Sequence, residues 1–534
     1  IPSNWDYYRP DMFGYAGVGW FRKSFVPCKE WSEKRLILKF EGVNYSAKVW
    51  VNGVLAGSHE GGFMPFEFDI TDKARFGEAN LIAVKVDNIP SEDKVPSSLA
   101  GWWNYGGIYR DVYIEVTNNL YIEDVFITAH PVADESQINL RLKVANRSSE
   151  VKRVKIETKI TTPDGEVILD GRREPRLFLD AEIQADADMT FETEIRVGGV
   201  KTWSIDDPNT YVLDACLRAP EGEILDTVST SFGVRTVTVE EGKLHLNGKP
   251  VMIRGVNRHE EYPKSGRADR DNMTESDLKM IKDDLGANMV RIHYPCEPRF
   301  YDLTDKLGLL VFAEIPFWGI RKEAMMNPRV VENAKQQLAV LVNRLRNHPS
   351  VVIWSVGNEC ESDNEVARSV ISELIQFVKE MDSTRPVTYV TMYIYSEERW
   401  CKCLDLGDFA SFNGYFDLHT DRLEKVLEKI HRENPGRSVL MTEFGGEAVR
   451  GIHGDIQGGE EHQAEVIEKT WNLISSRDYV MGGIVWSFTD YWHQARRLGT
   501  AYLNPVYFLH GILDLDRRPK KSFNVLGRLF SERD

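Results

Sequence analysis

An alternation of short apolar segments with amphipathic helical patterns, from about residue 237 to the end of the chain, constrains the fold more than any other feature of this sequence. We count eight apolar segments, at residues 250–257, 288–294, 309–314, 351–359, 386–391, 408–413, 438–444 and 482–488. This alternation predicts βα units around a parallel sheet. Eight units over roughly 300 residues favour a closed (β/α)8 TIM barrel over an open doubly wound sheet. The first segment is not followed by Gly-Xaa-Gly-Xaa-Xaa-Gly, which removes the main argument for a dinucleotide-binding fold.

Helical patterns are expected to fill the gaps between these strands. The pattern at residues 274–286 illustrates the signals. It opens with Thr274 and, three residues later, Asp277, which approximates a capping box, and it closes with Gly286. We therefore predict a helix that begins at Thr274 and ends before Gly286.

Two strand-rich regions precede the barrel, as expected for a chain of 534 residues, which is too long for a single core. Period-two alternation broken by Gly, Pro, Asn and Asp turn signals predicts a β-sandwich over residues 1–117. A second alternating stretch over residues 118–236 has the size of an immunoglobulin-like β-sandwich. The sequence thus predicts a multidomain protein with two N-terminal sandwiches and a C-terminal barrel over residues 237–534.

Charge and composition exclude several classes of function. A formal net charge of -16 and a pI near 5.4 oppose a polyanionic partner, so nucleic acid is not expected. The six cysteines lack the spacing of a disulfide framework and predict reduced thiols. The sequence contains no run of 18 apolar residues and no signal-peptide pattern, so we expect no membrane segment and a cytoplasmic location. The chain begins with Ile1, which suggests that an N-terminal piece precedes it.

Polar side chains close the apolar segments at the end where a barrel enzyme carries its active site. In chain order these side chains are Asn257, Arg258, His259, Glu260, Arg291, His293, Glu314, Asn358, Glu359, Thr391, Asn413, Tyr415, Glu443, Trp486 and Asp490. Capping and solubility need a few such residues, but not carboxylates on three strands together with His and Trp on others. The pattern therefore predicts a functional site at this end of the barrel.

Glu359 and Glu443 stand out because each closes a nearly uninterrupted hydrophobic run. Each alone is equally explained as half of a buried ion pair with a strand-end arginine such as Arg291 or Arg258. Together they lie on strands four and seven, nearly opposite across the barrel mouth. A retaining glycosidase needs two carboxyls about 5–5.5 Å apart, one protonated and one ionised. We expect burial and an ionised neighbour to raise the pKa of the acid, and Arg291 or Tyr415 to keep the nucleophile ionised.

The motifs around these residues resemble those of glycoside hydrolase family 2, the family of β-galactosidases, β-glucuronidases and β-mannosidases. NHPSVVIWSVGNE at 347–359 and SVLMTEFG at 438–445 resemble the family's two catalytic signatures. Upstream, GWFRKSF, YSAKVWVNG, GGFMPFEFDIT and NYGGIYRDV resemble its sugar-binding jelly-roll domain, and FGVRTV with LHLNGKPVMIRGVNRHEEYP resembles its entry into the barrel. The likeness covers nearly the whole chain.

The resemblance implies a retaining exo-β-glycosidase that acts by double displacement without a cofactor. It implies that Glu359 is the acid/base, that Glu443 is the nucleophile and that Asn358 donates to the sugar 2-hydroxyl. The remaining residues expected to bind substrate are His259, His293, Tyr415, Trp486 and Arg291. Family members are often dimers or tetramers, so a homo-oligomer is implied as well. The family pattern usually begins some tens of residues before the segment Pro2–Trp5, so we expect the jelly roll over residues 1–117 to be N-terminally incomplete.

Two departures from the family pattern bear on the sugar. β-Glucuronidases of the family bind the substrate carboxylate with an Asn-Xaa-Lys before a Gly, whereas NPVYFLHG at 504–511 lacks the lysine. A buried uronate without a cation is costly, which favours a neutral sugar. Arg496 and Arg497 lie just upstream, however, and TEFGGEAVRGIHG after Glu443 is more similar to β-glucuronidases. We rank β-galactosidase first and β-glucuronidase second.

Other positions leave alternatives open. Gly101 stands where many members place an Asp, and the adjacent Trp102 and Trp103 are explained either as a stacking face for a sugar or as core packing. The region EIPFWGI at 314–320 lacks the Glu-Xaa-His of the large β-galactosidases, so we expect no metal requirement. A non-catalytic carbohydrate-binding protein is the alternative of another class, although both carboxylates are present. A transglycosylase would use the same residues.

Overall fold

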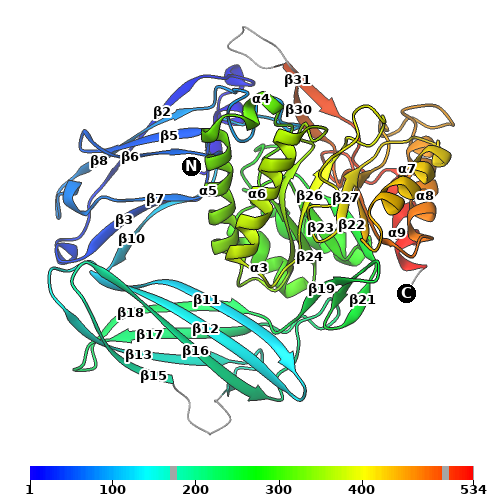
Figure 1. Cartoon of the computed structure of the whole chain (residues 1–534). Coiled ribbons are helices and arrows are strands. Elements are labelled where there is room, and N and C mark those ends of the chain that lie inside the picture. Colours follow the sequence, from blue (N-terminus) through cyan, green and yellow to red (C-terminus); the bar gives the residue numbers. More distant parts are fainter. Residues whose placement is uncertain (169–176, 496–503, 533–534) are drawn as a thin grey trace.

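The computed structural model describes residues 1–168, 177–495 and 504–532. Figure 1 shows two β-sandwiches and a barrel: the N-terminal sandwich packs against one side of the barrel, and the second sandwich lies below both. The fold class predicted from the sequence is confirmed, because the barrel closes and both preceding regions form sandwiches.

The N-terminal sandwich follows from the period-two alternation of its strands. One sheet has the order β2 (Val18–Phe25), β8 (Asn80–Asp87), β5 (Ser46–Val51) and β6 (Val54–Glu60). The facing sheet has the order β10 (Val112–Thr117), β3 (Arg35–Phe40) and β7 (Phe66–Asp69). A small third sheet joins β1 (Ser3–Asn4), β9 (Gly107–Ile108) and β4 (Val43–Asn44), and the short helix α1 (Trp5–Tyr8) follows β1. Alternate residues such as Val49 and Val84 point inward, where they pack with Leu38 and Phe40.

The second sandwich also has two antiparallel sheets. One contains β11 (Leu120–Val132), β12 (Glu135–Asn146) and β16 (Ala187–Gly198). The other contains β14 (Val167–Ile168), β13 (Lys152–Thr161), β17 (Tyr211–Arg218) and β18 (Ile224–Phe232), with β15 (Leu177–Ile183) also paired to β13. Their inward residues form a separate hydrophobic core.

The barrel has eight parallel strands, and every strand residue except the half-buried Arg254 is buried. They are β22 (Ile253–Asn257), β23 (Met289–Ile292), β24 (Leu310–Glu314), β25 (Val351–Asn358), β26 (Val387–Thr391), β27 (Ala410–Asn413), β28 (Val439–Phe444) and β29 (Val480–Val485). Each pairs with the next along the chain, and β29 closes on β22. Burial on both faces explains why these segments read as continuous apolar runs rather than alternating ones.

Helices cover the barrel in the gaps between strands, with one exception. They are α2 (Met273–Lys279), α3 (Pro298–Leu307), α4 (Lys322–Met325), α5 (Pro328–Leu345), α6 (Glu365–Met381), α7 (Thr420–Glu433), α8 (Glu460–Ser475) and α9 (Lys521–Ser531). The connection from β26 to β27 was expected to be helical but forms turns and loops. Its Cys401 and Cys403 are buried, and a Cβ on Gly407 would lie 2.8 Å from the Val387 carbonyl oxygen, so the segment packs flat against the barrel.

The start of α2 corrects the predicted capping box. The Asp269 carboxylate accepts hydrogen bonds from the backbone N–H groups of Met273 and Thr274, at 2.8 and 2.9 Å. The Thr274 hydroxyl instead lies 2.6 Å from that of Tyr262, so it does not cap the helix. The helical segment continues from α2 as a π-helical turn to Asp284, and Gly286 follows with a φ of +69°, as the predicted end requires.

Two further elements lie at the ends of the barrel. One is a three-stranded sheet of β19 (Val237–Glu240), β20 (Lys243–Leu246) and β21 (Lys249–Val251). Its apolar residues, such as Leu244, pack against the apolar interior at one end of the barrel. A hairpin of β30 (Tyr491–Ala495) and β31 (Asn504–Phe508) follows β29 at the opposite end. Among the described helices, none is long and apolar enough to cross a bilayer.

Candidate active site

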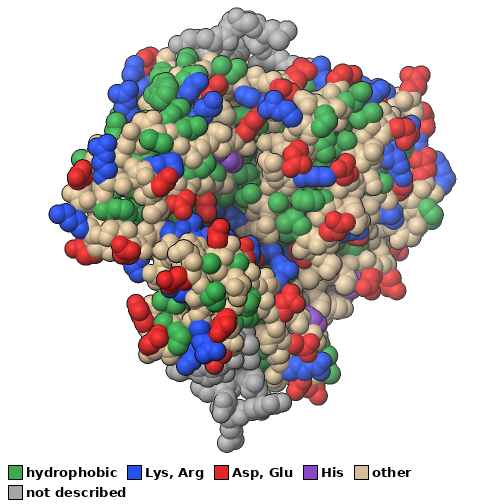
Figure 2. Space-filling model, turned by 60° about the vertical axis from the view of Figure 1, so that its left-hand side comes forward, with side chains coloured by type: hydrophobic (Ala, Val, Ile, Leu, Met, Phe, Trp, Pro, Cys, Tyr) green, Lys and Arg blue, Asp and Glu red, His purple; other side chains and the backbone are tan. Residues whose placement is uncertain are grey.

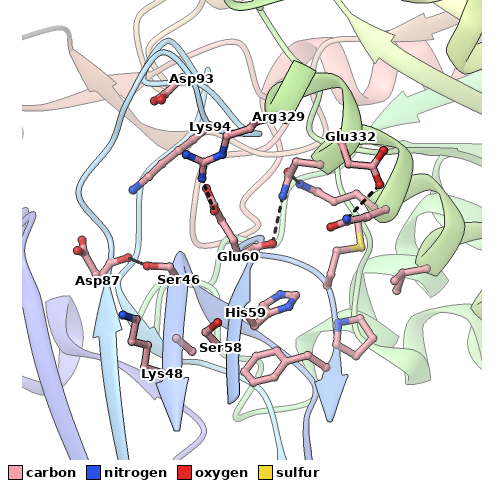
Figure 3. Close-up of a pocket in the computed structure, with 18 of the residues that line it drawn as sticks. Ser46, Lys48, Ser58, His59, Glu60, Asp87, Asp93, Lys94, Arg329 and Glu332 are labelled. Atoms are coloured by element: carbon pink, nitrogen blue, oxygen red, sulfur yellow. Dashed lines mark hydrogen bonds and ion pairs between the residues drawn. The ribbon is translucent and has the colours of Figure 1, made fainter. Parts of the chain in front are cut away.

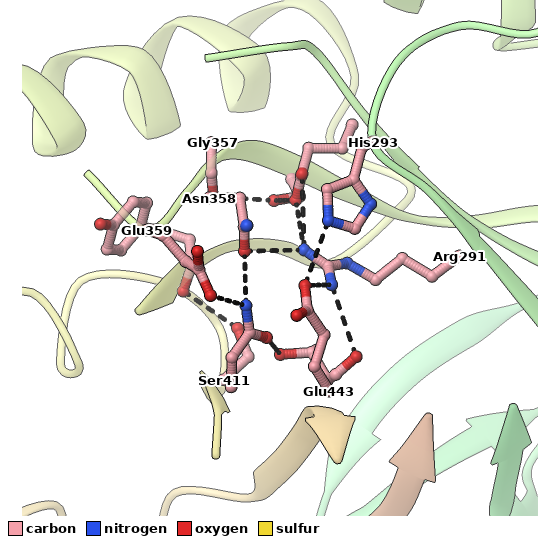
Figure 4. Close-up of polar contacts among 12 residues, drawn as sticks. Arg291, His293, Gly357, Asn358, Glu359, Ser411 and Glu443 are labelled. Atoms are coloured by element: carbon pink, nitrogen blue, oxygen red, sulfur yellow. Dashed lines mark hydrogen bonds and ion pairs between the residues drawn. The ribbon is translucent and has the colours of Figure 1, made fainter. Parts of the chain in front are cut away.

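A buried hydrogen-bond network joins the two candidate carboxylates at the mouth of the barrel (Figure 4). Arg291 on β23 donates to Glu443 at 2.8 Å and to the side-chain oxygen of Asn358 at 2.9 Å. Asn413 donates to the same Asn358 oxygen at 3.0 Å and to Glu359 at 2.7 Å. Four strand ends therefore hold Glu359 and Glu443 through fixed donors, which is the arrangement expected of a preorganised site.

Glu443 is held as an anion. Its Oε1 accepts from Arg291 and lies 3.1 Å from His293 Nε2, and its Oε2 accepts from the Tyr415 hydroxyl at 2.7 Å. A carboxylate only accepts, so the His293 Nε2 must carry the proton. Burial acts to raise the pKa of Glu443, but the hydrogen bond from His293 and the charge of Arg291 outweigh it. The pKa of Glu443 therefore lies below its ordinary value.

Glu359 is held as an acid. Burial, with the negative charge of Glu443 next in size, raises the pKa of Glu359 to about 8, although the hydrogen bond from Asn413 opposes the shift. Its backbone has a φ of +55°, in the left-handed region that side chains other than glycine rarely adopt. Such strain persists only where the surroundings fix it, and it is common at functional sites. The two carboxyls thus carry opposite protonation states near neutral pH.

Aromatic rings form the wall beside these carboxyls. The rings of His259 and His293 lie 5.3 and 5.0 Å from that of Trp486. Trp102, from the N-terminal sandwich, reaches this wall, with its ring 5.8 Å from His259 and 6.2 Å from Trp318. The sandwich therefore completes a site that the barrel begins.

Besides Nε of Arg291 and Nδ1 of His510, two buried polar atoms in this region lack a hydrogen-bond partner within the described part of the chain. They are Nδ2 of Asn358 and Nε2 of His259. Leaving such groups unpaired costs about 1–3 kcal/mol each. Both belong to residues that the sequence analysis placed in a sugar subsite, and a ligand with hydroxyl groups would satisfy them.

The structure separates some strand-end residues from the site. Arg258 pairs with Asp277 at 2.9 Å, and Glu260 pairs with Arg110 of the N-terminal sandwich at 2.9 Å. The ion-pair explanation raised for the two glutamates therefore holds in part: Arg291 does pair with Glu443, and also with Glu314 at 3.2 Å. Of the two tryptophans, Trp102 lies on the wall, whereas Trp103 stacks in the core on Phe13, with ring centroids 5.0 Å apart.

Sequence reasoning missed four residues near the carboxyls. The Tyr395 hydroxyl accepts from the backbone N–H of Tyr415 at 2.7 Å, and Trp318 packs beside Trp102. Tyr491, on β30, lies 4.6 Å from the His259 ring, and His493 faces Gly101, whose added Cβ would lie 3.7 Å from the His493 ring. The sequence feature that could have identified them is that each is a polar or aromatic residue in the segment that follows barrel strand three, five or eight.

The expectation of no metal requirement stays a prediction. Among the residues that the structure describes, no group of three or more His, Cys, Asp or Glu side chains has the arrangement of a metal site. Unchanged turnover after dialysis against EDTA would support the expectation, and activity restored by added Mg²⁺ would contradict it.

Family models match almost the whole chain. The model described as glycosyl hydrolases family 2, TIM barrel domain, matches residues 237–532. The family's sugar binding domain matches residues 5–118, and a third model, glycosyl hydrolases family 2, matches residues 120–235.

The relatives and solved structures to which the chain is similar are named for enzymes that act on different sugars. A β-galactosidase of Thermoanaerobacter pseudethanolicus is 33% identical over 79% of this chain, which spans 55% of that relative's length. A β-glucuronidase of Paenibacillus borealis is 26% identical over 97% of this chain and 88% of its own length. The crystal structure of a GH2 β-galacturonidase from Eisenbergiella tayi bound to galacturonate superposes with a TM-score of 0.88 at 27% identity, covering 100% of this chain and 93% of that one.

Proposed function

Because the chain belongs to glycoside hydrolase family 2, we propose that it is a retaining exo-β-glycosidase with Glu359 as the acid/base and Glu443 as the nucleophile. The observation that carries the proposal is the opposite state of the two carboxyls: the pKa of Glu359 is raised to about 8, and that of Glu443 is lowered. Double displacement needs one proton donor and one anion facing the same sugar.

The reaction proceeds in two balanced steps. In the first, a carboxylate oxygen of Glu443 attacks the anomeric carbon while Glu359 gives its proton to the departing oxygen. The bond to the aglycone breaks, and an ester to Glu443 forms. In the second, Glu359 takes a proton from water, the water oxygen attacks the anomeric carbon, and Glu443 leaves as a carboxylate. The configuration at the anomeric carbon is inverted twice and therefore retained.

The surrounding residues have supporting roles in this proposal. Asn358 Nδ2 donates to the sugar 2-hydroxyl, and Tyr415 and Arg291 orient Glu443 through the bonds described above. His259, His293 and Trp486 line the sugar subsite. Their rings offer an apolar face for the C–H bonds of a pyranose and ring nitrogens for its hydroxyls.

A neutral sugar, as in a β-galactosidase, is our first proposal for the substrate. His510 lies near Tyr415, with rings 5.8 Å apart, in the segment where β-glucuronidases carry their lysine. Burial lowers the pKa of His510 to about 4, so this side chain is neutral at pH 7. Nearby, Arg291 is engaged with Glu314 and Glu443, and Lys520 is paired with Asp490 at 2.7 Å. Neither is free to bind a uronate.

A β-glucuronidase is the second candidate, and the similarity to several uronide-hydrolysing relatives favours it. Arg496 and Arg497, the cations that would replace the missing lysine, lie outside the described residues. In the sequence they fall between β30 and β31, and His493 on the first of these strands lies beside Gly101.

A panel of p-nitrophenyl β-glycosides tests this proposal: galactoside, glucuronide, galacturonide, glucoside and mannoside. We expect release of nitrophenol, with the galactoside having the highest kcat/KM. A uronide that leads by tenfold or more would contradict the neutral sugar. In that case Arg496→Gln and Arg497→Gln should raise KM for the uronide specifically. Turnover of none of these glycosides would favour the non-catalytic carbohydrate-binding alternative.

The pH profile follows from the two pKa shifts. Glu359 must be protonated and Glu443 ionised, so kcat/KM should fall as pH rises through about 8 and also as pH falls below the lowered pKa of Glu443, under 4.5. The apparent pKa values of these two limbs belong to the coupled pair of carboxyls and not to either residue alone. The Glu359→Gln variant should lose the alkaline limb when assayed with a p-nitrophenyl glycoside. An alkaline limb that persists in this variant would contradict the assignment of the acid.

A further inference from the structure

A large groove lies outside the catalytic site, between the N-terminal sandwich and the barrel. Its volume is about 1110 Å³, and it runs between the outer face of β5, β6 and β8 and the beginning of α5. Figure 2 shows this face of the molecule hollowed between the two domains. The lining is rich in hydrogen-bonding side chains, among them Ser46, Ser58, Glu60, Asn333 and Gln336. In Figure 3, Ser46 lies against Asp87, and Glu60 points toward Arg329.

An exposed pair of indoles continues the groove along the same sheet. Trp20 is 56% exposed, and its ring stacks on that of Trp50 with centroids 5.4 Å apart. The register places Trp20 opposite Lys85, Lys85 opposite Lys48, and Lys48 opposite Ser58, so one row of side chains leads from the indoles into the groove. The pair leaves an apolar aromatic surface exposed to water, and an indole face suits the C–H face of a sugar ring.

The same face carries uncompensated positive charge. Lys48 and Lys85 are directly opposite on adjacent strands, an arrangement that is destabilising in the absence of an anion. Arg22 lies on the same face of β2 as Trp20. None of these three cations makes an ion pair with any residue in the ranges 1–168, 177–495 and 504–532. They stand out in a chain with 82 acidic and 66 basic residues.

Four acidic residues, Glu60, Asp87, Asp93 and Glu332, line the groove with four basic ones, and each acidic side chain has a local partner. Asp93 accepts from the Ser91 hydroxyl, and Glu332 accepts from the Gln336 side chain at 3.2 Å. The Glu60 carboxylate lies 3.9 Å from the Arg329 guanidinium. The Asp87 carboxylate accepts from the backbone N–H of Ile89 at 2.9 Å. The excess positive charge therefore lies on the row beside the indoles, where Lys48 and Lys85 lead into a polar groove. The indoles, the positive charge and the polar lining together match an acidic oligosaccharide better than a neutral one.

We propose that this face binds an anionic glycan chain, with sugar rings stacked on Trp20 and Trp50 and carboxylate or sulfate groups on Lys48 and Lys85. The family model for residues 5–118 is described as a sugar binding domain, and the proposal gives that domain a face and a ligand charge. The site shares no residue with the catalytic network. It would hold a polymer whose end is hydrolysed elsewhere, so it does not depend on which terminal sugar is cleaved.

Affinity electrophoresis of the whole chain tests the proposal, with the Glu359→Gln substitution present so that the polymer is not trimmed. Each gel contains one of three polymers. Polygalacturonate carries carboxylates, chondroitin sulfate carries sulfates as well, and β-galactan is neutral. We expect retardation by one or both acidic polymers, weakened by salt because ion pairs are screened. Trp20→Ala and the double variant Lys48→Gln/Lys85→Gln should each weaken binding by about tenfold or more. Tyr8→Ala and Lys425→Gln, at exposed positions elsewhere, should have no effect.

Several results would overturn the proposal. The first is that the Trp20 and lysine variants are retarded as strongly as the wild type. The second is that neither acidic polymer retards the wild type. The third is that polyglutamate, which has the charge without the sugar, retards the wild type as strongly as the acidic polysaccharides do. A fourth is a loss of oligomer mass in Trp20→Ala by light scattering, which would make this face a subunit interface. Turnover of p-nitrophenyl glycosides by Trp20→Ala without the Glu359 substitution should stay at the wild-type rate. That assay separates failure of the groove from failure of the catalytic proposal.

Discussion

Replacing Glu443 by Gln is expected to lower kcat/KM by about 10⁴-fold or more. Gln keeps the size of the side chain and one oxygen that can accept from Arg291, and its NH2 group can donate to the Tyr415 hydroxyl, but the amide is not a nucleophile toward the anomeric carbon. Without attack by Glu443 no ester forms, and the double displacement stops at its first step. The loss should be similar for p-nitrophenyl and alkyl glycosides, since the missing group acts on the sugar rather than on the leaving oxygen.

Initial rates on the preferred p-nitrophenyl glycoside measure this effect. Glu447→Gln provides a matched control, because Glu447 is 59% exposed and lies just after the same strand. The control should retain wild-type activity. Unchanged thermal unfolding would show that Glu443→Gln remains folded. A folded Glu443→Gln variant with more than one tenth of wild-type activity would refute the role of Glu443.

Replacing Arg291 by Met is expected to reduce the free energy of unfolding by about 3–5 kcal/mol. Arg291 is fully buried between the carboxylates of Glu314 and Glu443, at 3.2 and 2.8 Å. Its removal leaves two buried acids without their shared cation. The pKa of Glu443, now held below its ordinary value, should rise, and activity should fall as well because the nucleophile becomes protonated.

Urea unfolding at several pH values measures this loss. A carboxyl with a lowered pKa contributes stability that is present above its unfolded pKa and is lost as pH falls through the folded one. The difference between wild type and Arg291→Met should therefore be largest above pH 4.5 and shrink on acidification. Arg9→Met removes an exposed ion pair and should leave stability nearly unchanged. A difference that grows toward low pH would contradict the account of Glu443.

The barrel strands could be predicted because each is buried on both faces and therefore reads as a short apolar run. Glu359 and Glu443 could be chosen as candidates for the same reason, because each closes such a run and the two lie on strands four and seven of the predicted barrel. The cap of α2 could not, because Asp269 reaches the helix from outside the pattern and Thr274 is bonded to Tyr262. Local sequence cannot show which of several nearby polar side chains will accept the hydrogen bonds at the start of a helix.

Contacts between distant segments account for what the sequence left open. Trp102 and Trp103 are neighbours in the connection between β8 and β9 of the N-terminal sandwich, yet one contacts His259 at the barrel mouth and the other packs in the core. Asn413 links the two halves of the site by donating to both Asn358 and Glu359. Both outcomes depend on how the sandwich docks and how adjacent strands align, and neither leaves a periodic signal along the chain.

Trapping of the glycosyl-enzyme tests the central claim most directly. The protein would be incubated with a 2-deoxy-2-fluoro derivative of the preferred sugar that carries a good leaving group. Fluorine disfavours the oxocarbenium-like transition states, so the ester accumulates. We predict one added sugar per chain by mass spectrometry, located on the peptide that contains Glu443 and absent from Glu443→Gln. An adduct on another residue, or first-formed product of the α configuration by proton NMR, would contradict a retaining mechanism through Glu443.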